Sequence, residues 1–215
     1  MTDIKFKGLF LLILGCFCSF ASAQKVKVID TDFSKGQLTH VQQVSYRDLV
    51  KFHGHSCDGL LEGMQALELA LQVLYPDGIV DRTNTRVVSK SSPCLTDAAV
   101  YLTGGRYQYN SFYVNDSIQG MYIVQRIDNG KTVSVSRNKG VKPAIIDQMG
   151  SKAVRKELSY VQLRELKKYE DEYSQKLKKT DPALNFTVIT LFDYQWKSVL
   201  NPYFIKTDVI NKNAK

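Results

Sequence analysis

The residues best suited to chemistry lie in one stretch of this 215-residue chain, Phe52–Gly59, which reads FHGHSCDG. It holds two of the three histidines, His53 and His55, and one of the four cysteines, Cys57, at alternate positions. Imidazole nitrogens and thiolates are ligands that zinc prefers, and a thiolate is also a nucleophile. A second cysteine, Cys94, follows further along. Together they are a candidate ligand set, at a spacing typical of neither a zinc finger nor a zinc ribbon.

The residues on either side of this stretch predict two helices. The sequence SYRD at 45–48 has the form of a capping box and begins a short helix. We expect that helix to end at Gly54, because glycine readily adopts the left-handed conformation of a helix end. Apolar residues at three-to-four spacing predict a longer helix over Asp58–Tyr75. In an extended joint between the two, alternate side chains would point to one side, which brings both histidines and the first cysteine together.

Both candidate cysteines are predicted to lie at helix starts. Cys57 precedes the longer helix, and Pro93 and Cys94 begin a third helix that stops at Gly104. The first amides of a helix are unpaired and carry the positive end of its dipole, which favours a thiolate. We therefore expect both thiols to be good metal ligands or nucleophiles.

The rest of the chain predicts a single α+β domain. Apolar and polar residues alternate on both sides of Asn129-Gly130, a strong hairpin signal. Residues 24–43 are predicted to be an irregular or short-strand lead-in. The remaining predicted elements are a strand over Thr85–Ser89, a hairpin of Met121–Ile127 with Thr132–Ser136, a charged helix over Ser159–Lys179 and a strand over Asn185–Phe192. This order favours a mainly antiparallel or mixed sheet with helices packed on it.

Residues 1–23 are predicted to be a signal peptide. Two lysines precede an apolar run, and Ala21-Ser22-Ala23 is a small-residue cleavage pattern. Cleavage after Ala23 leaves residues 24–215 as the mature domain, periplasmic or secreted. The apolar run is shorter than the about 18 residues of a stable membrane span. A lipoprotein anchored through Cys16 is the alternative, and it fits less well because a leucine stands beside the required glycine.

The charge pattern argues against a nucleic-acid partner. The formal net charge of +8 is spread along the chain, and the sequence contains no block of lysine and arginine. It also lacks a Gly-rich phosphate loop and a redox Cys-x-x-Cys motif, so the substrate class stays open.

Two segments resemble the motifs of the FmdE family, which takes its name from a component of formylmethanofuran dehydrogenase. They are FHGHSCDGLLEG at 52–63 and SPCLTDAAVYLTGG at 92–105, and the similarity extends over about residues 45–136. The resemblance implies an α+β core of the type shared with the catalytic domain of glyceraldehyde-3-phosphate dehydrogenase. It also implies a metal-associated cleft, whose residues fall on His53, His55, Cys57, Cys94 and Asp97.

The chain departs from the family pattern at two places. Asp58 replaces the usual proline and would either cap the helix or add an oxygen ligand. No cysteine follows Cys94, so the C-terminal zinc ribbon of some members is absent. The enzyme that names the family is cytoplasmic and carries its redox chemistry on other polypeptides of the complex. An exported single-domain relative cannot meet those polypeptides, so we expect a metal-binding protein that is not itself a formylmethanofuran dehydrogenase.

Three functions stay open from the sequence. The chain could bind zinc, another divalent transition metal or a metallocofactor without catalysis. An open zinc position could instead activate water for hydrolysis, with Asp58 or Asp97 as the general base; Asp97 could also orient a ligating histidine. Alternatively, a disulfide between Cys57 and Cys94 could stabilise a metal-free binding protein, and the metal-bound and disulfide states could alternate. The sequence also leaves a homodimer open.

Overall fold

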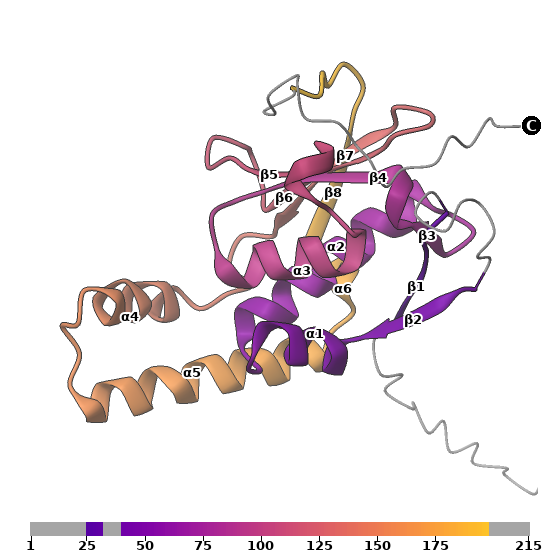
Figure 1. Ribbon diagram of the computed structural model, residues 1–215. Helices are drawn as coiled ribbons and strands as arrows, with labels where there is room; N and C mark the ends of the chain where they lie inside the picture. Colours follow the sequence, from indigo (N-terminus) through magenta and orange to yellow (C-terminus); the bar gives the residue numbers. More distant parts are fainter. Residues whose placement is uncertain (1–24, 32–39, 198–215) are drawn as a thin grey trace, which may run out of the picture.

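The computed structural model describes residues 25–31 and 40–197 (Figure 1). The predicted signal peptide, with Cys16, lies outside the described residues. The strands are β1 (Lys25–Ile29), β2 (Gln42–Ser45), β3 (Ile79–Asp81), β4 (Thr85–Ser89), β5 (Phe112–Val114), β6 (Tyr122–Arg126), β7 (Thr132–Arg137) and β8 (Phe186–Leu191). The helices are α1 (Tyr46–His53), α2 (Asp58–Leu74), α3 (Pro93–Thr103), α4 (Ala144–Val154), α5 (Tyr160–Lys179) and α6 (Pro182–Asn185).

The strands form two mixed sheets, which confirms the predicted α+β class. In the five-stranded sheet, in the order β5-β4-β6-β7-β8, only β4 and β5 pair in parallel. The predicted hairpin about Asn129-Gly130 is the β6–β7 pair, and Gly130 has a left-handed φ of 70°. In the second sheet, in the order β2-β1-β3, β1 is a short strand within the predicted irregular or short-strand lead-in. Its pairing with β2 and β3 was not predicted.

Helix α2 is the centre of the fold, because it is apolar on most of its surface. It packs on β6, β7 and β8 of the five-stranded sheet and on α1, α3, α5 and α6. The side chains on one face of α2 are at most 1% exposed: Leu60, Met64, Leu67, Leu71 and Leu74. Each fully buried side chain of this kind stabilises the fold by about 1.5–3 kcal/mol. Figure 1 shows α2 and α3 beneath the larger sheet, with α1 below them.

Two glycines let α3 approach α2 closely at the end where both helices begin. A Cβ at Gly59 would lie 3.1 Å from Cys94 Sγ, and a Cβ at Gly63 would lie 2.7 Å from Tyr122 Oη. A larger residue at Gly63 therefore forces a buried tyrosine to move. This close approach brings the first turns of α2 and α3 together.

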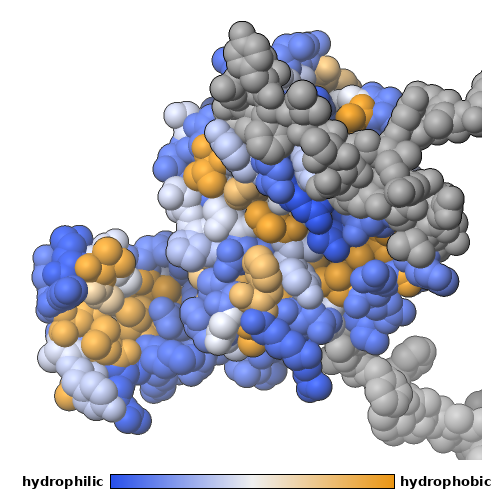
Figure 2. All heavy atoms as spheres, viewed as in Figure 1, coloured by the Kyte–Doolittle hydropathy of each residue, from blue (hydrophilic) through white to orange (hydrophobic). Residues whose placement is uncertain are grey.

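Helix α4 and the first part of α5 extend away from the rest of the molecule as an arm, whereas the later part of α5 packs against α2 (Figure 1). Along α5 the side chains of Leu166, Tyr173 and Leu177 are buried, whereas Leu163, near its start, is 43% exposed. Apolar side chains gather on the outer part of the arm (Figure 2). Across residues 25–31 and 40–197, no helix combines the length and apolar character that crossing a bilayer requires.

Candidate metal centre

The turn between α1 and α2 is fixed by its own hydrogen bonds. The capping box predicted at the start of α1 is present, with Ser45 as N-cap and Asp48 as its partner. The helix ends at Gly54, where φ is 95°, as expected for a glycine stop. The hydroxyl of Tyr46 donates to the carbonyl oxygen of Cys57 at 3.1 Å, and this bond ties the start of α1 to the start of α2.

The joint is not the extended segment that the sequence predicted. His53 is still the last residue of α1, and the left-handed Gly54 turns the chain before His55. The predicted gathering of side chains occurs all the same, because ligand atoms of His53, His55 and Cys57 all lie within 4.8 Å of one another. The turn, rather than the alternation of an extended chain, brings them together.

Three of the predicted ligands form a triangle of donor atoms. His53 Nε2 lies 3.9 Å from Cys57 Sγ and 3.7 Å from Cys94 Sγ, and the two sulfur atoms are 3.4 Å apart. Donors that share a tetrahedral zinc ion at ordinary bond lengths are about 3.6–3.8 Å apart. Both cysteines are free thiols in the structure. The donor spacing therefore fits a single zinc-sized ion.

His55 lies at the solvent side of this triangle. Its ring centroid is 4.6 Å from that of His53, and the residue is exposed, whereas the His53 side chain is only 5% exposed. His55 is therefore the most accessible of the four predicted ligands. Its placement allows either a fourth protein ligand or a site left open on that side.

Asp97 orients the imidazole of His53. Asp97 Oδ2 lies 2.7 Å from His53 Nδ1, so the carboxylate accepts the Nδ1 proton and leaves Nε2 free to face the sulfur atoms. Burial lowers the pKa of His53, but the hydrogen bond to Asp97 and the nearby charges of Cys57 and Asp97 leave that pKa raised. A carboxylate behind a histidine is the usual outer partner of a ligating imidazole. This is the arrangement expected for Asp97 from the sequence.

The two thiols differ in their readiness to ionise. Cys57 is the N-cap of α2, and its sulfur accepts the amide hydrogen of Leu60 at 3.3 Å. The hydrogen bond between the two sulfurs, together with that amide and the charge of His53, lowers the pKa of Cys57 to about 6 against the effect of burial. The same sulfur–sulfur contact, burial and the charge of Cys57 raise the pKa of Cys94.

Both cysteines lie at helix starts as predicted, with Cys57 as the N-cap of α2 and Cys94 in the first turn of α3. Two negative sulfurs 3.4 Å apart repel each other, so ionisation of Cys57 suppresses that of Cys94. A cation bound between the sulfurs would remove this repulsion.

Asp58 does not cap α2 as the sequence suggested, because Cys57 occupies the N-cap position. The Asp58 side chain is 10% exposed, and its Oδ2 lies 3.7 Å from Lys142 Nζ. The two candidate general bases thus have different neighbours: Asp97 pairs with His53, and Asp58 pairs with a lysine that precedes α4. For both carboxylates the role of general base stays a prediction.

A buried ion network, which the sequence did not reveal, begins beside Asp58. Glu62, only 3% exposed, accepts a 2.7 Å hydrogen bond from Arg137 Nη1 of β7. Lys142 Nζ lies 2.8 Å from Asp147 of α4, which is also 3.8 Å from Arg137. Burial raises the pKa of Glu62, partly offset by Arg137. The only signal in the sequence was Glu62, an acidic residue one turn after Asp58 on the helix.

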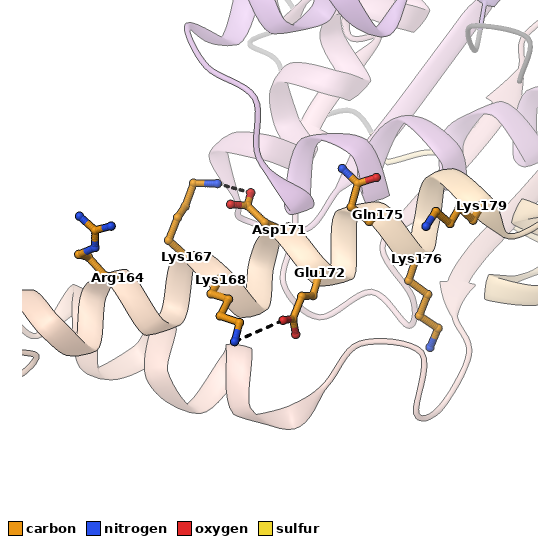
Figure 3. Close-up of a pocket in the computed structure, with 8 residues that line it drawn as sticks. All are labelled: Arg164, Lys167, Lys168, Asp171, Glu172, Gln175, Lys176 and Lys179. Carbon is orange, nitrogen blue, oxygen red and sulfur yellow. Dashed lines mark hydrogen bonds and ion pairs between the residues drawn. The ribbon is translucent and has the colours of Figure 1, made fainter.

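A large hollow lies elsewhere, along one side of α5 (Figure 3). Its volume is about 780 Å³, and its lining residues are Arg164, Lys167, Lys168, Asp171, Glu172, Gln175, Lys176 and Lys179. Two pairs one turn apart, Lys167–Asp171 and Lys168–Glu172, form ion pairs on this side. The exposed pairs are typical of a solvated helix surface. The residues that line this hollow include no cysteine or histidine, so the donor triangle, rather than the hollow, is the candidate centre.

Comparison with known proteins assigns the relevant region to a family. The family model described as "FmdE, Molybdenum formylmethanofuran dehydrogenase operon" matches residues 52–187. That range contains all four predicted ligands, Asp97 and the ion network. No curated protein matches the chain.

Proposed function

Because the chain belongs to the FmdE family, we propose that it is an exported protein that binds one transition-metal ion and is not itself a formylmethanofuran dehydrogenase. The ligands are His53, Cys57 and Cys94, with His55 as the fourth. The observation that carries the proposal is the donor triangle, with edges of 3.4–3.9 Å.

The chemistry of the donors indicates which ions fit. Two thiolates and an imidazole are soft to intermediate ligands, which select zinc and similar transition metals over magnesium or calcium. Two thiolates also balance the charge of a divalent ion. Zinc is therefore the first ion to test, followed by other divalent transition metals.

The residues around the donors are arranged to support binding. Asp97 fixes the ring orientation and tautomer of His53, so little ordering remains when an ion arrives. The Leu60 amide stabilises negative charge on Cys57. Gly59 leaves the space that the Cys94 sulfur occupies.

A hydrolytic enzyme is the second candidate, and the exposure of His55 favours it. If His55 does not ligate, three protein ligands leave one position open, as in catalytic zinc sites. A divalent ion there would supply Lewis acidity. The number of protein ligands therefore separates a binding protein from an enzyme.

Metal content per chain of the reduced, purified protein, together with a free-thiol titration, tests the proposal. We expect close to one ion per chain, lost when Cys57 is replaced by serine. His40→Ala is the matched histidine control, because His40 is exposed and lies outside both motifs. A metal-free chain with no free thiols would mean that Cys57 and Cys94 form a disulfide, and the metal proposal would be withdrawn.

The effect of His55→Ala on stoichiometry and on solvent access to the ion separates the two candidate functions. If His55 is a ligand, its loss weakens binding and opens the site to exchangeable water. If His55 is not a ligand, the variant behaves like His40→Ala, and assays for hydrolysis follow.

The export part of the proposal rests on the leader sequence alone and has its own test. N-terminal sequencing of protein recovered from the periplasm or medium should begin at Gln24. A lipid-modified cysteine at position 16 would support the lipoprotein alternative instead.

A further inference from the structure

We infer that Cys57 and Cys94 also form a thiol–disulfide couple, and that a small-molecule disulfide oxidises the pair and releases the bound ion. The inference rests on the proposed function for its metal half. It adds a second chemistry to the same two sulfurs, so that the site holds an ion only while the cysteines are reduced.

The sulfur atoms are already close to bonding distance. They are 3.4 Å apart, and a disulfide bond is about 2.05 Å long. The remaining approach is about 1.4 Å. This proximity is a property of the helix packing, because the absence of a side chain at Gly59 lets the backbone of α2 lie against Cys94. The packing of the two helix starts thus holds the two thiols together.

The two thiols are both half-buried, but they differ in their hydrogen bonds. Cys57 is half-buried and directly follows two exposed residues, His55 and Ser56, in the turn after α1. Its sulfur accepts the Leu60 amide hydrogen, which supports the anionic form that attacks a disulfide. The Cys94 sulfur lies 3.4 Å from that of Cys57, and among the described residues no amide of another residue donates to it. This geometry makes Cys57 the attacking thiol and Cys94 the resolving thiol.

The reaction balances with a disulfide RS–SR as the only oxidant. The sulfur of Cys57 attacks one sulfur of the reagent, the S–S bond breaks, and one RS⁻ leaves. Cys94 then attacks the mixed disulfide at Cys57, which forms the Cys57–Cys94 bond and expels the second RS⁻. The cysteine pair loses two electrons, the reagent gains them, and both RS⁻ groups take up protons from water. The ion keeps its charge and leaves as a dication.

Release of the ion follows from the loss of two ligands. Thiolate is the form of cysteine that binds metal, and a disulfide sulfur carries no negative charge. Only His53 and His55 then remain from the predicted set. Conversely, a bound ion occupies the sulfur electron pairs and should slow oxidation.

The test starts from the reduced, zinc-loaded protein and adds oxidised glutathione in the absence of oxygen. Zinc release is followed with a chromophoric chelator, and peptide mapping locates any disulfide. We expect loss of the one zinc ion per chain in parallel with a Cys57–Cys94 disulfide, and recovery of both states after a dithiol reductant. Retention of zinc while the disulfide forms, or failure to form it at excess oxidant, would overturn the inference.

Two variants keep the two proposals separable. Cys94→Ser should stop the reaction at a glutathione adduct on Cys57, whereas an adduct only in Cys57→Ser would overturn the assigned order of attack. His53→Ala should bind zinc poorly yet still form the disulfide. If the reduced wild type binds no zinc at all, the proposed function fails, and the peptide map still reports whether the cysteines are a redox couple.

Discussion

Two groups of polar residues, which the molecule uses differently, lie beside the start of helix α2. The donor cluster surrounds its first turn and consists of His53, His55, Cys57 and Cys94. The ion network lies beside it and consists of Asp58, Glu62, Arg137, Lys142 and Asp147. The two groups lie next to each other. The ion network runs from the enclosed Glu62 and Asp58 outward to Asp147, whose side chain is 57% exposed.

The difference lies in what each group contacts. In the ion network every acid faces a base, as Glu62 faces Arg137 at 2.7 Å, so the charges compensate one another. In the donor cluster, electron-pair donors face other donors across 3.4–3.9 Å. Charges paired with opposite charges are typical of groups with a structural role. Lone-pair donors that converge without a cation between them are typical of a metal site. We therefore expect substitutions in the donor cluster to reduce metal binding, and substitutions in the ion network to reduce the stability of the fold.

The largest effect is expected from Cys57→Ser. The variant loses the thiolate shared by two edges of the donor triangle and should no longer retain an ion through gel filtration. Elemental analysis before and after the column measures this. An unchanged ion content would show that the donor cluster is not the site.

Arg137→Met should destabilise the fold by about 3 kcal/mol, because it leaves Glu62 buried without its partner. Chemical denaturation of the metal-free protein measures the change. Zinc stoichiometry of the folded variant should stay at the wild-type value. Loss of zinc with unaltered stability would mean that the two groups are one functional unit.

Asp97→Asn should weaken metal affinity by roughly 10–100-fold, because the neutral amide holds and polarises His53 less well. Competition with a chelator of known affinity measures this change. Stability of the metal-free chain should change far less than in Arg137→Met. Wild-type affinity in the variant would argue that His53 is not a ligand.

The smallest effect is expected from Glu62→Gln, and it should depend on pH. Burial raises the folded-state pKa of Glu62 above 4.5, so its contribution to stability is full below pH 4.5 and declines as pH rises through the folded pKa. The wild type should therefore lose stability relative to the variant as pH rises from 4.5 towards neutrality. Parallel denaturation series of the two proteins give the difference, and a constant difference would contradict the raised pKa.

The sequence predicted much of the fold where local signals were strong. The capping box at Ser45, the glycine stops at Gly54 and Gly104 and the Asn129-Gly130 turn all lie where expected. Helix α4 was missed because Pro143, its N-cap, makes no side-chain capping bond, and only two of its residues are buried. The sequence pattern did not predict the pairing of β1 with β2. Short strands are stabilised mainly by their pairing partners, which no local signal in the sequence reveals.

The candidate site was predicted residue by residue, but its mutual geometry was not. The sequence by itself determined which donors exist and that Cys57 and Cys94 begin helices, because ligand chemistry and capping are local properties. Only the tertiary structure decided that α3 lies close enough to α2 to place the sulfurs 3.4 Å apart, and that one thiol thereby suppresses ionisation of the other. It also decided that Asp58 faces Lys142, whereas Asp97 faces His53. Such outcomes depend on distances between segments far apart in the chain, which packing sets and local sequence does not encode.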